Sequence, residues 1–344
     1  QKDIYAWYGI PYAKPPTGEL RWKAPRDFEF TSNHFDATKL PNRCVQVSNF
    51  YDELITGQKE GTIFGSEDCL YLNVFAPADT FKSNKKLPVM FWIHGGGNTW
   101  GYSASPMHIP TNFLKFHDVI LVTINYRLGP FGWFTHPSIQ DLQLDLDKTS
   151  NFGTLDIIAA LEWVQSNISL FGGDPNNVTI FGESAGGHNV LSLLVAKQAK
   201  GLFHKAISQS GYTTTYSKQS AYKQSKESST SKHTSWPIVN RIIKDKVLDI
   251  SQEDNKFEVR ELLKSLSAEE FFKYYSERPS YENLTILTAD GIVIPEIGLT
   301  KALSKKEYVN HVPTIAGSNK DEVKLWLASA KYFVDLDNSF FGSI

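Results

Sequence analysis

Short apolar runs alternate along much of the chain with segments in which apolar residues recur at helical spacing. The runs at residues 88–93 and 119–125 are apolar at most positions, which is typical of strands buried on both faces of a sheet. Residues 156–167 place four apolar side chains on one helical face: Ile157, Ile158, Leu161 and Val164. This alternation predicts an α/β fold with a doubly wound, mainly parallel sheet, in which active groups gather at the carboxyl ends of the strands.

Other parts of the chain carry different patterns. Residues 4–30 are rich in proline and aromatic residues, which excludes a helix and predicts an extended edge segment with turns. Thr, Ser, Lys and Gln dominate residues 213–235, so we expect a flexible surface loop there. The amphipathic stretch that follows predicts a helical, cap-like region over residues 236–280. A last strand is expected at residues 312–317, with another helix after it. We interpret residues 1–344 as one domain.

A β-rich run at residues 178–181 leads directly into the sequence Gly-Glu-Ser-Ala-Gly, and apolar residues at helical spacing follow. Strand, sharp turn and helix are the setting that a Gly-x-Ser-x-Gly nucleophile requires. Gly182 and Gly186 allow the strand and the helix to approach closely, which lifts Ser184 out of the sheet in a strained conformation. The Gly-x-Ser-x-Gly pattern alone is a weak signal, but its position between a predicted strand and a predicted helix makes Ser184 the candidate nucleophile.

Ester hydrolysis through a serine also needs donors for the developing oxyanion. The buried strand at residues 88–93 runs into residues 94–97, His-Gly-Gly-Gly. Gly96 and Gly97 carry no side chain, so their N–H groups can approach a tetrahedral oxygen, and the N–H of Ala185 adds a third donor. The alternative is a flexible loop, but three glycines at the end of a buried strand favour an oxyanion hole.

Two carboxylates are candidates for the same site. Glu322 follows the strand expected at residues 312–317 and comes later in the chain than Ser184, which is the order in which this kind of site uses its acid. Its alternative role is that of an exposed carboxylate at a helix start. Glu183, beside the nucleophile, is expected in a supporting position, where it tunes the local field or holds a structural water.

The general base is not evident in the sequence. The histidine should follow the acid, but no histidine occurs after His311, which lies at the far end of its strand, roughly 20 Å from the site. His188 follows Ser184 by one helical turn and is expected to be a packed helix residue. His94 belongs to the glycine loop. His117 and His136 have no candidate catalytic partners around them in the sequence.

Composition and charge narrow the classes of function. The net charge of −2 gives no reason to expect nucleic acid or an anionic membrane as partner. No apolar run approaches the length of a membrane-spanning helix, and no metal-ligand spacing occurs, so neither a metal nor another cofactor is expected. No signal peptide is visible, but the chain begins with Gln1 rather than Met. For the two cysteines, Cys44 and Cys69, composition alone favours two unrelated buried thiols.

Eight segments together resemble the type-B carboxylesterase family, which includes the cholinesterases, fungal lipases and the catalytically inactive neuroligins. In chain order they are YGIPYA (8–13), SEDCLYLN (66–73), HGGG (94–97), NYRLG (125–129), WVQSNI (163–168), FGGDP (171–175), GESAGG (182–187) and NKDE (319–322). The resemblance implies an α/β-hydrolase fold and a serine carboxylesterase that acts on uncharged esters through an acyl-enzyme. By position, the nucleophile is Ser184, the triad acid is Glu322, and the oxyanion donors are Gly96, Gly97 and Ala185.

The resemblance also implies a disulfide and two internal ion pairs: Cys44 with Cys69, Arg21 with Glu67, and Arg127 with Asp156. The disulfide would indicate secretion or a periplasm. The family's chain starts earlier and continues to a catalytic histidine, so we expect residues 1–344 to be a part of a longer enzyme, incomplete at both ends and a poor catalyst alone.

Departures from the family pattern concern single positions. The family usually has Gln where this chain has Ile157, and Gly where it has Val323. No Trp lies between the two cysteines, so the aromatic choline platform is missing, which argues against a cholinesterase. Two alternatives to a small-ester hydrolase stay open: a neuroligin-like binding protein without catalysis, and a lipase that prefers long acyl chains. Ser184, the glycine loop and Glu322 together argue against the binding protein.

Overall fold

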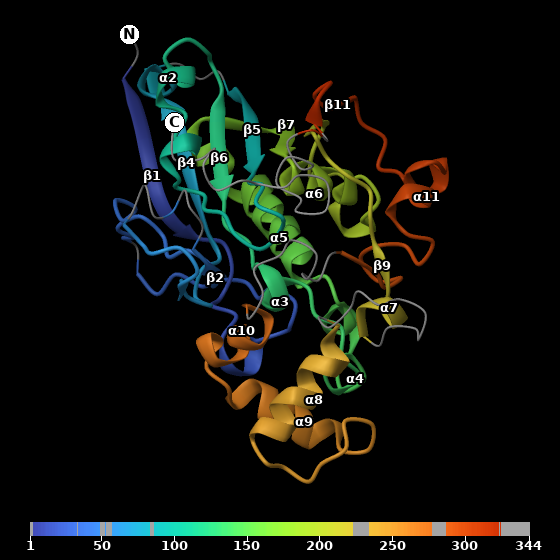
Figure 1. The fold of residues 1–344 in the computed structure, drawn as a ribbon. Coiled ribbons are helices and arrows are strands. Elements are labelled where there is room, and N and C mark those ends of the chain that lie inside the picture. The colour runs from blue at the N-terminus through green and yellow to red at the C-terminus, as the bar shows by residue number, and fades with distance from the viewer. Residues whose placement is uncertain are drawn as a thin grey trace, which may run out of the picture.

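Within the residues that the structure describes, the apolar runs form the middle of a seven-stranded sheet with the order β1-β4-β6-β5-β7-β8-β11 (Figure 1). This computed structural model describes residues 3–32, 34–48, 52, 57–82, 86–222, 234–276, 287–322 and 324. The strands of the sheet are β1 (Ile4–Pro11), β4 (Tyr71–Pro77), β5 (Leu87–Ile93), β6 (Ile120–Ile124), β7 (Gly173–Glu183), β8 (Lys205–Gln209) and β11 (Thr314–Gly317). A separate short pair consists of β2 (Gln46–Val47) and β3 (Ile63–Phe64).

The strands from β6 across to β11 pair in parallel, whereas β1 and β4 join antiparallel. The predicted mainly parallel sheet is therefore confirmed, and the extended N-terminal segment forms its edge. Ile93 at the end of β5 lies opposite Gly182 of β7, and Gln209 of β8 lies opposite both Glu183 and Gly317. Because parallel strands end at the same edge, the segments that follow β5, β7, β8 and β11 leave the sheet side by side.

Helices and loops cover the two faces of the sheet unequally. The helices are α2 (Thr111–Leu114), α3 (Gly129–Gly132), α4 (Pro137–Gln140), α5 (Phe152–Asn167), α6 (Ala185–Leu193), α7 (Lys218–Tyr222), α8 (Ser235–Asp245), α9 (Lys256–Ser265), α10 (Ala268–Ser276) and α11 (Leu299–Leu303). On one face, α5 and α6 bury Leu161 and Val190 in the main core. On the other face, Leu114 of α2 packs with Phe75 and Leu121 in a smaller cluster. This packing holds α6, and with it the turn at Ser184, against the sheet.

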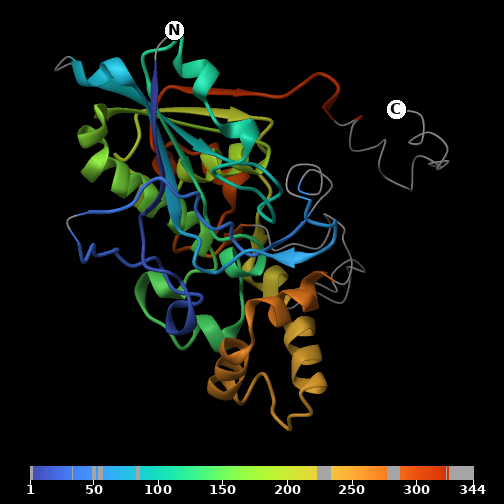
Figure 2. The same ribbon diagram turned by 90° about the vertical axis from the view of Figure 1, so that its left-hand side faces the viewer.

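The helices α8, α9 and α10 form a second apolar cluster beside the sheet, at the lower end of the molecule in Figures 1 and 2. Trp22 and Phe134 belong to the same cluster and connect these helices to earlier parts of the chain, since the ring of Trp22 stacks on Phe134 and meets Phe271 of α10 edge-on. These helices occupy the region in which the sequence predicts a cap, and residues 277–280 of that prediction lie outside the described residues.

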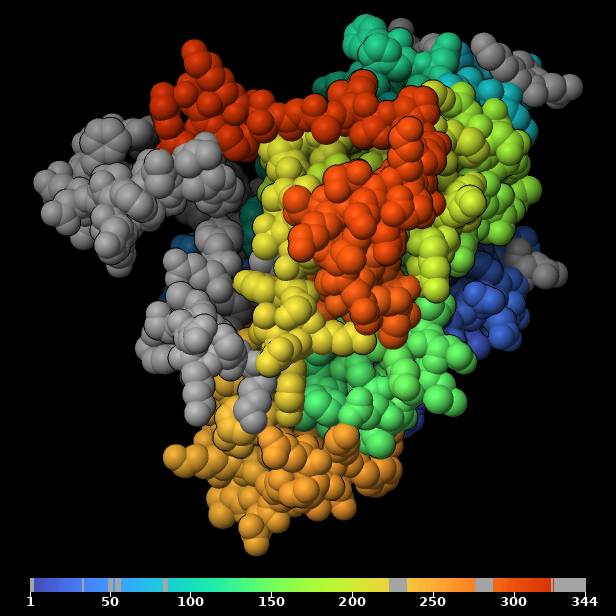
Figure 3. Space-filling model, turned by 90° about the vertical axis from the view of Figure 1, so that its right-hand side faces the viewer, coloured from blue at the N-terminus to red at the C-terminus, as the bar shows by residue number. Residues whose placement is uncertain are grey.

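Residues 213–222 differ from the flexible loop expected there. They contain β9 (Tyr216–Ser217) and α7, and β9 pairs in parallel with β10 (Thr288–Ala289). The partner strand lies far along the chain, so the polar local composition does not reveal it. Residues 223–233 lie outside the described part of the chain. On the same side of the molecule, α11 packs Leu299 and Ala302 against Val195, just beyond α6. The orange segment that contains α11 lies on the surface of this face (Figure 3).

Candidate active site

The turn between β7 and α6 carries Ser184 in the strained conformation expected from the sequence. Its φ of 55° and ψ of −120° lie in a region that residues other than glycine rarely occupy. A Cβ added at Gly182 would lie 2.5 Å from the carbonyl carbon of Gly186, and one added at Gly186 would overlap the carbonyl oxygen of Ile93. Only glycine therefore fits on either side of the serine, because β5, β7 and α6 meet there backbone to backbone.

Two backbone hydrogen bonds hold the turn at Ser184. The Ser184 N–H donates to the carbonyl of Gln209 at the end of β8, at 2.8 Å. The Ser184 carbonyl accepts from the N–H of His188, at 2.9 Å, which starts the ladder of α6. Ser184 is partly exposed while its neighbour Ala185 is buried. The turn thus presents a serine side chain at the carboxyl edge of the sheet.

The glycine loop after β5 lies directly against this turn. A Cβ added at Gly95 would lie 2.8 Å from the carbonyl oxygen of Glu183 and 3.4 Å from the Cβ of Ser184. Gly96 and Gly97 have φ values of 94° and 61°, which belong to the left-handed region. Within the described residues, the N–H groups of Gly96, Gly97 and Ala185 donate no hydrogen bond. The loop and the helix start therefore hold unused donors beside the serine.

The carboxylate of Glu322 is fixed by two hydrogen bonds to Oε2. The backbone N–H of Asn319 donates to it at 2.8 Å and the hydroxyl of Ser210 at 2.7 Å. These two bonds, that of Asn319 first, lower the pKa of Glu322 below its ordinary value, so the group is ionised at neutral pH. Ser210 has a φ of 50°, and its N–H donates to the carbonyl of Gly317 at 2.7 Å. The structure thus brings the ends of β8 and β11 together at this carboxylate.

Ser210 could not be identified as a site residue from the sequence. The available signal was its position directly after β8, the strand next to β7, but its pairing with a carboxylate depends on the sheet register. Glu183 is the second carboxylate near the turn. Partial burial, and then the negative charge of Glu322, raise the pKa of Glu183. The charge of Glu322 therefore acts on Glu183 across the site.

The histidines that are fully buried are packed and neutral. Burial lowers the pKa of His94 and of His188 to about 3 and that of His136 to about 4. His94 stacks on Tyr126 with ring centroids 4.4 Å apart, and His188 lies 4.1 Å from the ring of Tyr212. Groups with such pKa values are weak bases at neutral pH. The packed role expected for His188 thus agrees with its surroundings.

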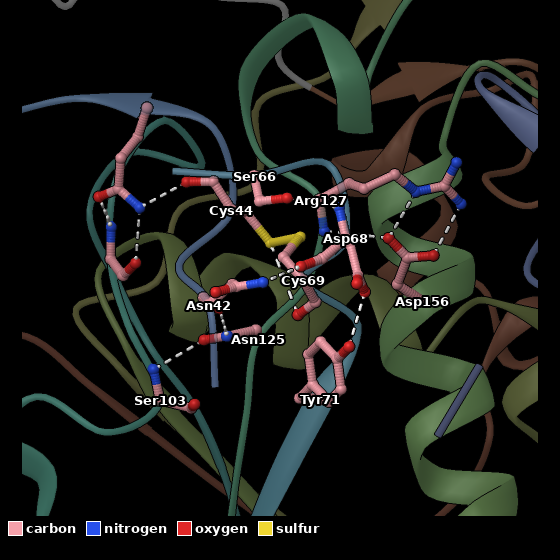
Figure 4. The surroundings of a disulfide bond; sticks show 12 residues. Asn42, Cys44, Ser66, Asp68, Cys69, Tyr71, Ser103, Asn125, Arg127 and Asp156 are labelled. Atoms are coloured by element: carbon pink, nitrogen blue, oxygen red, sulfur yellow. Dashed lines mark hydrogen bonds and ion pairs between the residues drawn. A yellow bond between two sulfur atoms is a disulfide. The ribbon is translucent and has the colours of Figure 1, made fainter. Parts of the chain in front are cut away.

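The structure contains the disulfide and the two ion pairs that the resemblance implied. Cys44 and Cys69 are bonded, with Cα atoms 5.0 Å apart, as the resemblance implied (Figure 4). Arg127 and Asp156 form a two-pronged pair with distances of 2.8 and 2.7 Å, both almost fully buried. It fixes the segment after β6 at the start of α5, next to the disulfide (Figure 4).

The other implied pair joins Arg21 to Glu67, with distances of 2.7 and 2.5 Å. Arg21 also donates to the carbonyls of Leu263 and Leu266 at the end of α9, at 3.0 and 2.8 Å. This arginine therefore connects the segment before the disulfide loop to the helices of the second apolar cluster.

Over the part of the chain that the structure describes, no three His, Cys, Asp or Glu residues lie together as metal ligands would. No helix in that same part combines the length and apolarity needed to cross a membrane.

Comparison with known proteins places these residues in a family context. The sequence model of the carboxylesterase family matches residues 1–340. The para-nitrobenzyl esterase of Bacillus subtilis (strain 168) is 47% identical over 221 residues, which cover 64% of this chain and 43% of that protein. The liver carboxylesterase of Sus scrofa is 37% identical over 330 residues, which cover 93% of this chain and 55% of that protein.

Solved structures agree with this match. A para-nitrobenzyl esterase structure superposes with a TM-score of 0.76 at 34% identity, over 98% of this chain and 62% of that one. A carboxylesterase of Geobacillus stearothermophilus, solved at pH 6.8, gives a TM-score of 0.76 at 33% identity, over 98% of this chain and 64% of that one. The chain spans about half the length of the curated relatives it matches.

Proposed function

The chain belongs to the carboxylesterase family, and on that premise we propose that it supplies the nucleophile, the oxyanion donors and the triad acid of a serine carboxylesterase. The observation that carries the proposal is the strained Ser184 beside three N–H groups without partners in the described residues. Strain at a serine between a strand and a helix is costly, and such cost is typical of a functional position.

In the proposed reaction, the Oγ of Ser184 adds to the carbonyl carbon of an ester while its proton passes to a base. The carbonyl oxygen becomes an oxyanion that accepts hydrogen bonds from Gly96, Gly97 and Ala185. One such donor contributes about 3–4 kcal/mol to transition-state stabilisation. The alcohol then leaves with the proton, and water releases the acid from the acyl-serine in the same way.

The proposed role of Glu322 is to orient an imidazole and to stabilise its protonated form. The lowered pKa supports this role, because an ionised carboxylate can accept the N–H of an imidazolium. We assign the base to none of the buried histidines, His94, His136 and His188, since their pKa values of about 3 to 4 make them poor proton acceptors. Glu183 is proposed to act on the field at the site.

The substrate class we propose is small, uncharged carboxylic esters, with no cofactor. The disulfide between Cys44 and Cys69 supports a secreted or periplasmic location, because such bonds persist in oxidising compartments. A long-chain lipase and a binding protein without catalysis are the alternatives from the same family.

The test is an esterase assay on the full-length protein that contains this chain. It should hydrolyse p-nitrophenyl acetate, and Ser184→Ala should lower turnover on the order of a million-fold. A fluorophosphonate probe should add its phosphonyl mass to Ser184 alone. Comparison of p-nitrophenyl acetate, butyrate and palmitate separates an esterase from a lipase. A folded protein without turnover on any of these esters, or one whose turnover survives Ser184→Ala, would rule the proposal out.

A further inference from the structure

A buried amide pair connects the glycine loop with the nucleophile helix. Asn98 directly follows Gly97, and its Oδ1 accepts a hydrogen bond of 2.8 Å from the Nδ2 of Asn189 on α6. Both asparagines are almost completely buried, with 1% and 0% exposure. Asn98 has a φ of 59°, a left-handed value that asparagine tolerates better than most residues. A buried amide pair that joins two segments this distant in sequence specifies their relative placement.

The two ends of this bond lead directly to the proposed oxyanion donors. Asn98 is one residue from Gly97 in the loop. Asn189 lies one turn along α6 from Ala185, and residues four apart lie on the same face of a helix. The distance between the loop donors and the helix donor is therefore set in part by the contact of Asn98 with Asn189.

The other anchors of the loop lie on different elements. The hydroxyl of Tyr126 donates to the carbonyl of His94 at 2.7 Å, and the carbonyl of Asn98 accepts from the N–H of Gly129 at 2.7 Å. These contacts tie the loop to the segment after β6. The bond to Asn189 ties it to the helix that carries Ala185.

We propose that Asn98 and Asn189 are a positioning pair, which holds the N–H groups of Gly96 and Gly97 at the correct distance from that of Ala185 for an oxyanion. The inference rests on the proposed esterase function. Neither side chain touches the substrate: the pair acts through the backbone donors at its two ends. Because preorganised donors act only when charge develops, loss of the pair lowers kcat rather than substrate binding.

The test uses the full-length protein with Asn98→Gly, Asn189→Ala and the double variant. Asn98→Gly keeps the positive φ without strain, so it remains informative if Asn189→Ala does not fold. Each single variant should lower kcat for p-nitrophenyl butyrate about tenfold, with KM changed less than about twofold. Because the two residues act as one unit, the double variant should lose about as much as either single variant.

A second readout separates positioning from general stability. A trifluoromethyl ketone binds Ser184 as a tetrahedral oxyanion, so its inhibition constant should rise about tenfold in the same variants. Ser192→Ala is the matched control, since Ser192 is equally buried on α6 and its hydroxyl bonds the carbonyl of Asn189 at 2.7 Å. This control should keep the wild-type kcat.

Wild-type kcat in both single variants, an effect confined to KM, or losses that multiply in the double variant would overturn the positioning role. A wild-type protein that is inactive, or that stays active as Ser184→Ala, would instead show that the esterase proposal has failed, and the positioning role would fall with it.

Discussion

The hydroxyl of Ser210 donates a 2.7 Å hydrogen bond to Oε2 of Glu322 across 112 residues of sequence. This bond joins the loop after β8 to the loop after β11, and the backbone N–H of Asn319 shares the same oxygen. The proposed triad acid is thus held by one side chain and one backbone group, both on the segments that leave the carboxyl edge of the sheet.

Ser210→Ala should lower the kcat/KM of the full-length protein about tenfold, because Glu322 loses one of its two fixed hydrogen bonds and orients an imidazole less well. The same change should raise the pKa of Glu322, since the Ser210 hydroxyl helps to lower it. Glu322→Gln should cost far more, on the order of ten-thousand-fold. The measurement is the turnover of p-nitrophenyl acetate by the wild-type protein and the two variants. Wild-type turnover in Glu322→Gln would show that Glu322 is not the triad acid.

Asp156→Ala should destabilise the protein by about 3–5 kcal/mol, because it leaves the guanidinium of Arg127 buried without its partner. The pair is 3% and 0% exposed, and Asp156 also accepts the backbone N–H of Arg127 at 3.0 Å. Urea unfolding of the variant and of a surface control, Asp141→Ala, measures the difference. Equal midpoints for the two would contradict the prediction. Arg127→Lys should also be less stable than the wild-type protein, because lysine cannot reproduce the two-pronged geometry of the pair.

Replacing both disulfide cysteines, as Cys44→Ala with Cys69→Ala, should lower the free energy of unfolding by roughly 3.5 kcal/mol in the chain-entropy model. The bond closes a loop with a sequence separation of 25, and both residues are nearly inaccessible to solvent. The native protein should therefore resist mild reductant, and its two cysteines should react with iodoacetamide only when the protein is unfolded in the presence of that reductant, which frees their thiols. Rapid alkylation of the folded protein would contradict the buried position of the bond.

Stability should fall as the pH is lowered from 7 to 5. His94 and His188 have pKa values of about 3 in the folded protein, whereas unfolded histidine titrates near 6.5, so the unfolded chain takes up protons in this window and the folded protein does not. Each such histidine should remove about 2 kcal/mol over this range. His188→Leu should reduce the pH dependence by one histidine's share in urea unfolding at both values, with exposed His34→Leu as control. An unchanged pH dependence in His188→Leu would mean that His188 titrates in the folded protein as it does in the unfolded chain.

Much of the fold could be predicted from local patterns in the sequence. The apolar runs predicted at residues 88–93 and 119–125 correspond to β5 and β6, within a residue or two at each end. The turn at Ser184 was equally predictable, because strand, glycines and helix are adjacent in the chain. In each case the physical cause acts over a few residues: burial of one short run, or a turn that only glycine allows.

Contacts between distant segments were decided only by the tertiary structure. The sequence could not pair β9 with β10, and residues 213–222 were therefore expected to form part of a loop. Nor could it bring Ser210 to Glu322 or Asn98 to Asn189, which are 112 and 91 residues apart. These pairs depend on which parallel strands are neighbours and in which register they lie. A single polar residue contains no information on either, because its partner becomes its neighbour only when the sheet is complete.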